Sequence, residues 1–265
     1  MPTVNLKTGG RAVTPGLRPT LELLNITKRY GQVAALTDVN FSVTAGEIVA
    51  LVGDNGAGKS TLVKAIAGAH RIDGGEIRID GNSVTIGSPT DSTTLGIETV
   101  YQDLALCDNL DVTANLFLGR ERRRVNSALL DLEGMESQAK AIIADLAAHL
   151  PTLDKPVSAL SGGQRQAIAV SRAALWGSRV VLLDEPTAAL GVAQTAMVYK
   201  LVRGLRDRGL AVVVISHNMA DVFAVADRIV VLRLGRNAGE FTPATTRPDE
   251  VVAAITGSNA IGGAA

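Results

Sequence analysis

The sequence predicts an α/β protein in which a parallel sheet carries helices on both faces and is interrupted by a helical insertion. Short apolar runs of strand length alternate with stretches of helical period, which is typical of parallel sheets. One such run, residues 47–52, leads directly into a glycine-rich loop and then a helix. Another, residues 180–183, ends in two carboxylates. The 265 residues are enough for one large domain with a sizeable core.

The first part of the chain predicts strands and one helix. Val39, Phe41 and Val43 alternate with polar residues, which indicates a strand with one solvated face. The run 47–52 is nearly all apolar, so we expect it to be buried on both faces. The expected strands are 21–27, 35–43, 47–52, 76–80 and 97–101, and the expected helix is 59–67, ended by Gly68.

The middle of the chain changes to a helical period. From Asp111 to about His149 apolar residues recur at helical spacing, and Pro151 and Pro156 then lead back to the main body. The apolar stripe consists of Leu132, Met135, Ala139, Ile142, Leu146 and Leu150. Beyond it the alternation resumes, with expected strands at 180–183, 211–215 and 228–234 and expected helices at 193–208 and 218–226.

Composition argues against several classes of protein. Lys+Arg and Asp+Glu are both 26, so the net charge is zero and nucleic acid is not expected as a partner. We interpret the basic run Arg122-Arg123-Arg124 as a solvated helix end. The single cysteine, Cys107, allows no internal disulfide and is expected to pack in the core. No run approaches the ~18 apolar residues of a membrane-spanning helix, and residues 1–20 lack the apolar stretch of a signal peptide.

A phosphate-binding loop is predicted for the run Gly53-Asp54-Asn55-Gly56-Ala57-Gly58-Lys59-Ser60-Thr61. Glycines before a helix let backbone N–H groups approach phosphates, and the helix dipole favours their negative charge. Lys59 is expected to reach the β- and γ-phosphates, and the Ser60 hydroxyl suits Mg²⁺. The alternative is a chance glycine-rich turn, but the strand before the loop and the helix after it favour nucleotide binding.

Two carboxylates follow the buried strand 180–183. In open α/β sheets ligands bind at the carboxyl ends of the strands. Asp184 is therefore expected to hold Mg²⁺, and Glu185 to polarise an attacking water as a general base. The run Ser161-Gly162-Gly163-Gln164 repeats the anion-binding pattern at a helix start, and by itself it is equally compatible with an ordinary helix N-cap.

With these runs in this order, the chain resembles the nucleotide-binding subunit of ATP-binding cassette (ABC) transporters over roughly residues 21–257. The resemblance implies the ABC ATPase fold: a P-loop NTPase core with a mixed sheet, an N-terminal antiparallel β subdomain and a helical insertion at about 103–160. Residues 1–20 and 258–265 would then be a flexible N-terminal extension and a flexible tail. A P-loop small-molecule kinase is the rival, but it leaves the 160–164 segment without a role.

The same resemblance implies roles for further residues. Tyr30 would stack on adenine with Val33 beside it, Gln102 would sense Mg²⁺ and contact the membrane subunit, and His217 would lie near the γ-phosphate. The 160–164 segment would act as a signature that closes over ATP bound to another copy, so that two subunits sandwich two ATP molecules head to tail. DNA-repair and translation-factor members of the family match less well, because the insertion is short and the chain is neutral.

Three runs resemble the branch of the family that imports monosaccharides such as ribose, xylose, galactose and fructose: residues 101–106, 115–121 and 185–192. Most members of that branch fuse two cassettes, whereas this chain shows one cassette and no internal repeat, which implies the fructose-type form and a homodimer. The implied function is the ATP-hydrolysing motor of sugar uptake, peripheral at the cytoplasmic face of the membrane. Its cofactors would be ATP and Mg²⁺, and its partners a membrane permease and, indirectly, a secreted sugar-binding protein.

One position departs from the family pattern. Gly191 stands where many members carry an Asp that helps to couple the two sites. An ABC ATPase that energises transport of a different substrate is the remaining alternative, because the substrate is selected by subunits on other chains.

Overall fold

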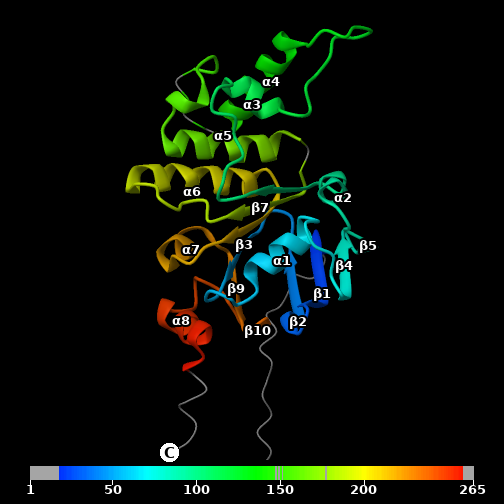
Figure 1. The fold of residues 1–265 in the computed structure, drawn as a ribbon. Coiled ribbons are helices and arrows are strands. Elements are labelled where there is room, and N and C mark those ends of the chain that lie inside the picture. Colours follow the sequence, from blue (N-terminus) through cyan, green and yellow to red (C-terminus); the bar gives the residue numbers. More distant parts are fainter. Residues whose placement is uncertain (1–17, 147, 149, 151, 177, 259–265) are drawn as a thin grey trace, which may run out of the picture.

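The computed structural model describes residues 18–258 except 147, 149, 151 and 177 (Figure 1). In this part of the chain the larger sheet has six strands in the order β10-β9-β3-β8-β7-β6. All of its neighbouring strands are parallel except β9 and β10, so the sheet is mixed, as predicted. The strands are β3 (Ile48–Val52), β6 (Ile97–Val100), β7 (Val180–Asp184), β8 (Ala211–Ile215), β9 (Arg228–Arg233) and β10 (Arg236–Phe241).

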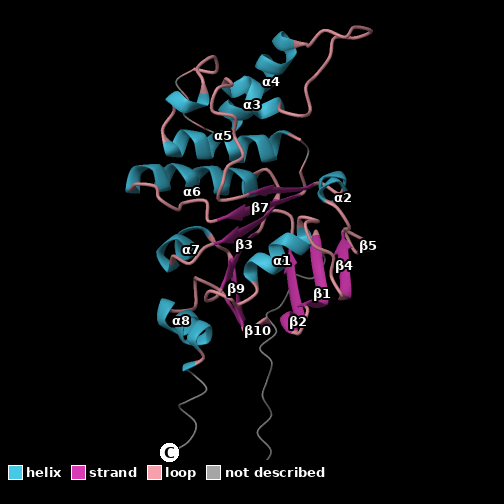
Figure 2. Cartoon of the chain, viewed as in Figure 1, coloured by secondary structure: helices cyan, strands magenta, loops and turns pink. Residues whose placement is uncertain are grey.

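A smaller antiparallel sheet lies beside it, which confirms the predicted N-terminal β subdomain (Figure 2). Within the described residues its order is β2-β1-β4-β5. The first strand extends beyond the predicted 21–27, and its pairing shifts register between Leu23 and Ile26 and again before Arg29. Such bulges explain its imperfect alternation. The strands are β1 (Leu21–Tyr30), β2 (Val33–Val43), β4 (Gly74–Ile79) and β5 (Asn82–Val84).

Helices cover both faces of the larger sheet (Figure 1). Alternate residues of β7 belong to two separate hydrophobic clusters: Val180 and Leu182 pack with α1, whereas Val181 and Leu183 pack with α5 and α6. Because side chains alternate across a strand, α1 and α5 lie on opposite faces of the sheet. The helices are α1 (Lys59–Ile66), α2 (Pro89–Thr94), α3 (Val112–Phe117), α4 (Leu132–Asp145), α5 (Gly162–Leu175), α6 (Val192–Asp207), α7 (Met219–Val225), α8 (Pro248–Thr256) and the 3₁₀ turn η1 (Val157–Ala159).

The helical prediction for residues 111–149 is wrong over its centre. Helices α3 and α4 lie there, but residues 118–131 between them form an exposed loop with one isolated bridge from Arg123 to Leu130 (Figure 1). Gly119 has φ +77° and Asn126 has φ +55°, and such left-handed residues end a helix. The basic run 122–124 therefore lies on a loop and not at a helix end.

The predicted apolar stripe is buried in its middle but not at its two ends, since Leu150 lies beyond α4 and is only partly buried. Met135, Ala139, Ile142 and Leu146 are buried in the main core, whereas Leu132 is 61% exposed because it directly follows the loop. The prediction that reached His149 ends on a residue outside the described ones.

The chain ends differ slightly from the expected boundaries. Residues 1–17 and 259–265 lie outside the described part. Within the described residues, the Thr20 N–H donates to the carbonyl oxygen of Val43 at 2.9 Å, so Thr20 pairs with β2 just before the predicted position 21. Strands β5 and β10 and helices α2 and α8 were not predicted, since none carries a clear apolar period.

Candidate nucleotide site

The predicted phosphate loop joins the end of β3 to the start of α1. Gly53 has φ +153° and Gly58 has φ +103°, a region that favours glycine. A Cβ at Gly53 would lie 2.3 Å from the carbonyl oxygen of Leu232, and one at Gly58 would lie 2.8 Å from the Leu36 side chain. Both positions therefore require glycine for conformation and for close approach of neighbouring chain.

Helix α1 begins without a side-chain cap. Its N-cap residue is Gly58, and among the described residues no side chain caps its first turn. Uncapped N–H groups together with the helix dipole form an anion site. The loop itself is braced, because Ala57 donates to the Asp54 carbonyl and Gly235 donates to the Ala57 carbonyl, both at 3.1 Å. The loop is thus held in place by backbone hydrogen bonds and presents uncapped N–H groups suited to phosphate.

Lys59 lies over this loop. Its Nζ donates to the carbonyl oxygens of Gly53 at 2.7 Å and Asp54 at 3.0 Å. Burial lowers the pKa of Lys59, and the charges of Glu185, Asp54 and Asp184 partly offset this effect. The structure therefore brings the predicted lysine within electrostatic reach of both predicted carboxylates.

Four site segments leave the same edge of the larger sheet. The phosphate loop follows β3, His217 follows β8, Glu185 follows β7 and Gln102 follows β6, and these strands are parallel neighbours in that order. In the register, Asp184 lies opposite Ile215. The carboxyl edge of the sheet therefore gathers residues from four distant parts of the chain, as expected for a ligand site in an α/β sheet.

Glu185 and His217 are in direct contact. Glu185 Oε1 lies 2.7 Å from His217 Nδ1, and the Glu185 side chain is 17% exposed whereas that of His217 is 75% exposed. Glu185 has φ +49°, which is rare for a residue with a side chain, and it precedes Pro186. Its N–H donates to the Ile215 carbonyl at 2.9 Å, so pairing with β8 holds this unfavourable backbone in place.

The residues predicted to bind Mg²⁺ fit a hard cation. Burial, followed by the nearby Glu185, raises the pKa of Asp184 above its ordinary value. A divalent cation would reverse that effect by favouring the charged carboxylate. Among the described residues no group of three or more His, Cys, Asp or Glu could hold a metal. Mg²⁺ normally needs only one or two protein oxygens together with phosphates and water, so Asp184 and the Ser60 hydroxyl suffice.

Tyr30 lies at the end of β1 in the smaller sheet and is 43% exposed. Its ring meets His70 edge-on with centroids 5.6 Å apart, and Lys28 Nζ lies 5.5 Å from the Tyr30 centroid. His70 was missed from the sequence, because a histidine just after a helix belongs to no motif. Stacking of adenine on Tyr30 beside Val33 stays a prediction.

The predicted signature opens α5. The Ser161 Oγ accepts from the Gln164 N–H at 3.3 Å, and the Gln164 Oε1 accepts from the Ser161 N–H at 2.9 Å, so the two residues form a capping box. A Cβ at Gly163 would lie 3.0 Å from Gln194, and one at Gly162 would lie 3.2 Å from Leu190. The signature therefore packs on the segment that follows Glu185, and its helix lies across the sheet from α1.

Helix α5 also holds the loop after Gln102. Arg172 donates to the carbonyl oxygens of Leu104 at 3.1 Å and Ala105 at 3.0 Å. The same loop is also held by the buried Asn115 of α3, which accepts from the Cys107 N–H at 2.7 Å and donates to the Cys107 carbonyl at 3.0 Å. The contacts of Arg172 and Asn115 were not predicted, because the resemblance of the runs 101–106 and 115–121 assigned no individual role to Leu104, Ala105 or Asn115.

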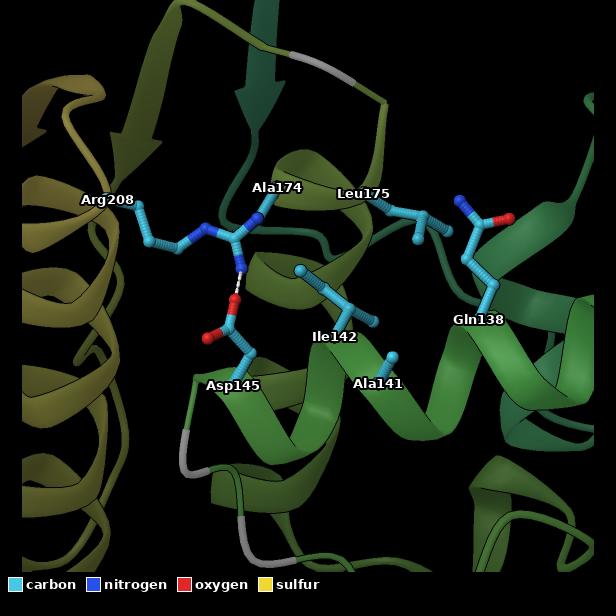
Figure 3. A pocket seen from close by; sticks show the side chains of 7 residues that line it. All are labelled: Gln138, Ala141, Ile142, Asp145, Ala174, Leu175 and Arg208. Carbon is cyan, nitrogen blue, oxygen red and sulfur yellow. Dashed lines mark hydrogen bonds and ion pairs between the residues drawn. The ribbon is translucent and has the colours of Figure 1, made fainter.

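A pocket of about 420 Å³ lies elsewhere, where α4, the C-terminal end of α5 and the residue after α6 meet (Figure 3). Figure 3 shows the ion pair between Arg208 and Asp145 at one side of the pocket. None of the predicted site residues lines this pocket. Its lining residues are Gln138, Ala141, Ile142, Asp145, Ala174, Leu175 and Arg208. The predicted site residues are at the sheet edge and not in this pocket.

Comparison with known proteins agrees with the geometry. The ABC transporter family matches residues 36–188, more than half of the chain. The fructose import ATP-binding protein FrcA of Rhizobium meliloti is 47% identical over 246 residues, which cover 91% of this chain and 95% of that protein. The xylose/arabinose import ATP-binding protein XylG of Sulfolobus acidocaldarius is 43% identical over 236 residues, 89% of this chain and 93% of that protein.

Other relatives are longer. The ribose import ATP-binding protein RbsA of Yersinia pestis is 41% identical over 239 residues, which cover 90% of this chain but 46% of RbsA. This chain therefore spans about half the length of RbsA and nearly the full length of FrcA and XylG.

Solved structures show the same fold. A nucleotide-free ATP-binding cassette from an ABC transporter has a TM-score of 0.78 at 24% identity, covering 92% of this chain and 98% of that one. A dimeric bacterial ABC transporter cassette has a TM-score of 0.70 at 26% identity, covering 84% and 98%. The α/β fold, the edge residues and these relatives agree, and the chain belongs to the ABC transporter family as an ATP-binding cassette that hydrolyses ATP.

Proposed function

We propose that this chain is the ATP-hydrolysing subunit of a monosaccharide importer. The observation that carries the proposal is the match, over nearly their whole length, to two single-cassette relatives whose names specify fructose import and xylose/arabinose import. The runs at 101–106, 115–121 and 185–192 support the same branch. The individual sugar is chosen by subunits on other chains.

In this proposal the phosphate loop and the uncapped start of α1 bind the phosphates of ATP. Lys59 exchanges its contacts with the Gly53 and Asp54 carbonyls for the β- and γ-phosphate oxygens. Ser60, Asp184 and Gln102 would hold Mg²⁺, which would supply positive charge beside the transferred phosphoryl group. Tyr30 supports the adenine.

Glu185 polarises the water that attacks the γ-phosphate. Its carboxylate is largely buried and contacts the His217 imidazole at 2.7 Å, so its orientation is constrained before the nucleotide arrives. His217 follows β8, the neighbour of β3 in the sheet, so its exposed ring lies at the same sheet edge as the phosphate loop. In this pair Glu185 acts as the positioned base, and His217 provides a polar contact to the γ-phosphate.

The complete site needs a second copy of the chain. Helices α1 and α5 lie on opposite faces of the sheet, so Ser161, Gly162, Gly163 and Gln164 serve the ATP of a partner subunit. Dimers occur among the similar cassette structures. The proposed assembly is therefore a homodimer with two ATP sites, each built from the phosphate loop of one subunit and the signature of the other.

The motor acts on a separate membrane protein. In the described part of the chain no helix is long and apolar enough to cross a membrane. We place the dimer at the cytoplasmic face of the membrane, bound to permease subunits through the loop after Gln102, with a secreted sugar-binding protein as an indirect partner. No role for nucleic acid is proposed.

Replacing Glu185 by Gln tests the chemical assignment. The purified E185Q variant should keep ATP affinity within about twofold and lose hydrolysis by about 100-fold or more, since the general base is removed and the loop is intact. The matched control is E136Q, at an exposed position of α4, which should hydrolyse at the wild-type rate. Hydrolysis by E185Q at the rate of E136Q would refute the base.

Sugar uptake tests the biological assignment. In cells that lack the gene, the wild-type chain should restore accumulation of a labelled sugar such as fructose, xylose or ribose, and E185Q should not. The rival kinase predicts a phosphorylated sugar made by the purified chain without membranes. Phosphorus NMR separates the two, because the proposed motor releases ADP and inorganic phosphate and forms no sugar phosphate.

A further inference from the structure

The carboxylate of Asp221 is buried beside the segments that follow β7 and β8, and Asp221 belongs to no predicted motif. It is on the first turn of α7 and is 8% exposed. Oδ2 accepts from the Thr187 hydroxyl, and Oδ1 accepts from the Tyr199 hydroxyl and from the Asn218 amide at 3.0 Å. Among the described residues no Lys, Arg or His forms an ion pair with this carboxylate. A buried carboxylate with neutral donors alone is costly and calls for a reason.

Two of the three donors belong to the loops that carry Glu185 and His217. Thr187 lies two residues after Glu185, in a turn closed by the Ala188 N–H to the Glu185 carbonyl at 3.1 Å. Asn218 directly follows His217. One carboxylate thus receives a hydrogen bond from each of the two loops whose Glu185 and His217 side chains lie 2.7 Å apart.

The third donor fixes the carboxylate to the body of the protein. Tyr199 lies in the middle of α6, whose Val198, Leu201 and Val202 are buried against the larger sheet. Burial and the bond to Asp221 raise the pKa of Tyr199, so its hydroxyl keeps its proton and donates at neutral pH. Asp221 is therefore anchored from α6 as well as from its own helix.

The backbone of Glu185 needs such support. A φ of +49° before a proline is unfavourable, and strained residues persist only where the surroundings over-determine them. The N–H of Glu185 is fixed to Ile215 at 2.9 Å, but this bond fixes only the start of the turn. The Thr187 hydroxyl supplies the second fixed point.

We propose that Asp221 is a positioning residue for hydrolysis, which sets the loop of Glu185 against the loop of His217 through the Thr187 hydroxyl and the Asn218 amide. This inference rests on the proposed role of Glu185 as base. It predicts that the hydroxyl of Thr187 matters for turnover and not for ATP affinity, because the phosphate loop does not contact Asp221 through any of these bonds.

Two substitutions at Thr187 distinguish positioning from packing. T187V keeps the volume and removes the hydroxyl, whereas T187S keeps the hydroxyl and loses a methyl group. Positioning predicts that kcat falls about tenfold in T187V and stays within about twofold of wild type in T187S, with the Kd for ATP unchanged in both. Packing alone predicts the reverse order, with T187S the more impaired.

Further variants guard against a trivial loss of folding. T94V makes the same change at an exposed hydroxyl of α2 and should leave kcat and Tm unchanged. D221N keeps the shape of the side chain but cannot accept the hydrogen bonds from Thr187, Tyr199 and Asn218 together. The kcat should therefore again fall about tenfold at constant Kd. Thermal unfolding of each variant shows whether it is folded at the assay temperature.

The outcomes separate this inference from the proposed function. Loss of hydrolysis in E185Q with wild-type kcat in folded T187V and D221N would overturn the role of Asp221 and leave the base in place. Retained hydrolysis in E185Q would overturn the base itself. A low kcat in T187V together with a nearly wild-type kcat in T187S would support the positioning role of Asp221.

Discussion

Helices α1 and α5 both begin at a run of glycines that suits phosphate, yet the two starts are built differently. At α1 the N-cap is Gly58, with φ +103° and no side-chain cap in the described structure. At α5 the N-cap is Ser161, whose hydroxyl and the Gln164 amide cap each other's backbone N–H groups. The first backbone N–H groups of α1 have no side-chain acceptor, whereas some of the N–H groups at the start of α5 already donate to the capping side chains.

This difference shows that the two halves of the proposed site are prepared to different degrees. The loop before α1 needs no rearrangement of caps to receive a phosphate, and Lys59 lies over it. At α5 the Ser161 hydroxyl is engaged within its own helix, so binding a partner's nucleotide competes with the cap. The phosphate loop is expected to provide most of the ATP affinity, and the signature mainly the response to bound ATP.

The largest effect is expected at the open start. K59A removes the cation that faces the phosphates, so ATP hydrolysis should fall about 100-fold or more and ATP affinity should fall with it. Steady-state phosphate release and nucleotide titration measure both. K200A, at an exposed position on α6, is the control and should match wild type. Wild-type affinity in K59A would show that the loop backbone alone binds ATP.

An intermediate effect is expected at the capped start. S161A removes one half of the capping box, so it should destabilise the chain by about 1 kcal/mol and lower Tm by about 2–4 °C. Hydrolysis should fall about tenfold or more, whereas ATP binding to the monomer should stay unchanged.

The control for S161A is S88A, since Ser88 caps α2 through the Asp91 N–H. It should lower Tm in the same way with full hydrolysis. Equal loss of hydrolysis in S88A and S161A would mean that Ser161 acts only as a cap.

The smallest effect is expected at a third helix start, that of α6. Gly191 has φ −75° and an added Cβ meets nothing within 4 Å, so Asp fits there and can cap the helix. G191D should stabilise the chain by about 0.5 kcal/mol, or about 1–2 °C in Tm. V192D adds the same charge one residue later and separates charge from capping. A fall in Tm with G191D, measured calorimetrically, would contradict the cap.

The phosphate loop and the pair Asp184-Glu185 could be predicted because each directly follows a buried apolar run, whereas Gln102 was predicted only through the resemblance. The order of strand, loop and helix around Lys59 and the pair Asp184-Glu185 after β7 define both the fold and one edge of the sheet. The sequence also predicted His217 through the resemblance. Its contact with Glu185 at 2.7 Å is a finding of the structure.

Features that depend on distant pairing were missed. The residues of β10 show no apolar alternation, and the strand forms by pairing with β9. The loop at 118–131 carries enough leucine to imitate a helical period, but its left-handed residues break the helix. The hydrogen bonds of the Asp221 carboxylate join residues up to 34 positions apart, and no local sequence pattern marks them.

The two hydrogen bonds from Arg172 to the loop after Gln102 have a mechanical consequence. A planar guanidinium that donates to two successive carbonyls resists rotation of the loop as well as its displacement. Because Arg172 belongs to α5, a push on this loop is transmitted to the far end of that helix, where Ser161 begins it. The loop and helix α5 therefore move together as one rigid unit. A displacement of the loop reaches Ser161 at the start of the helix without any change in the larger sheet.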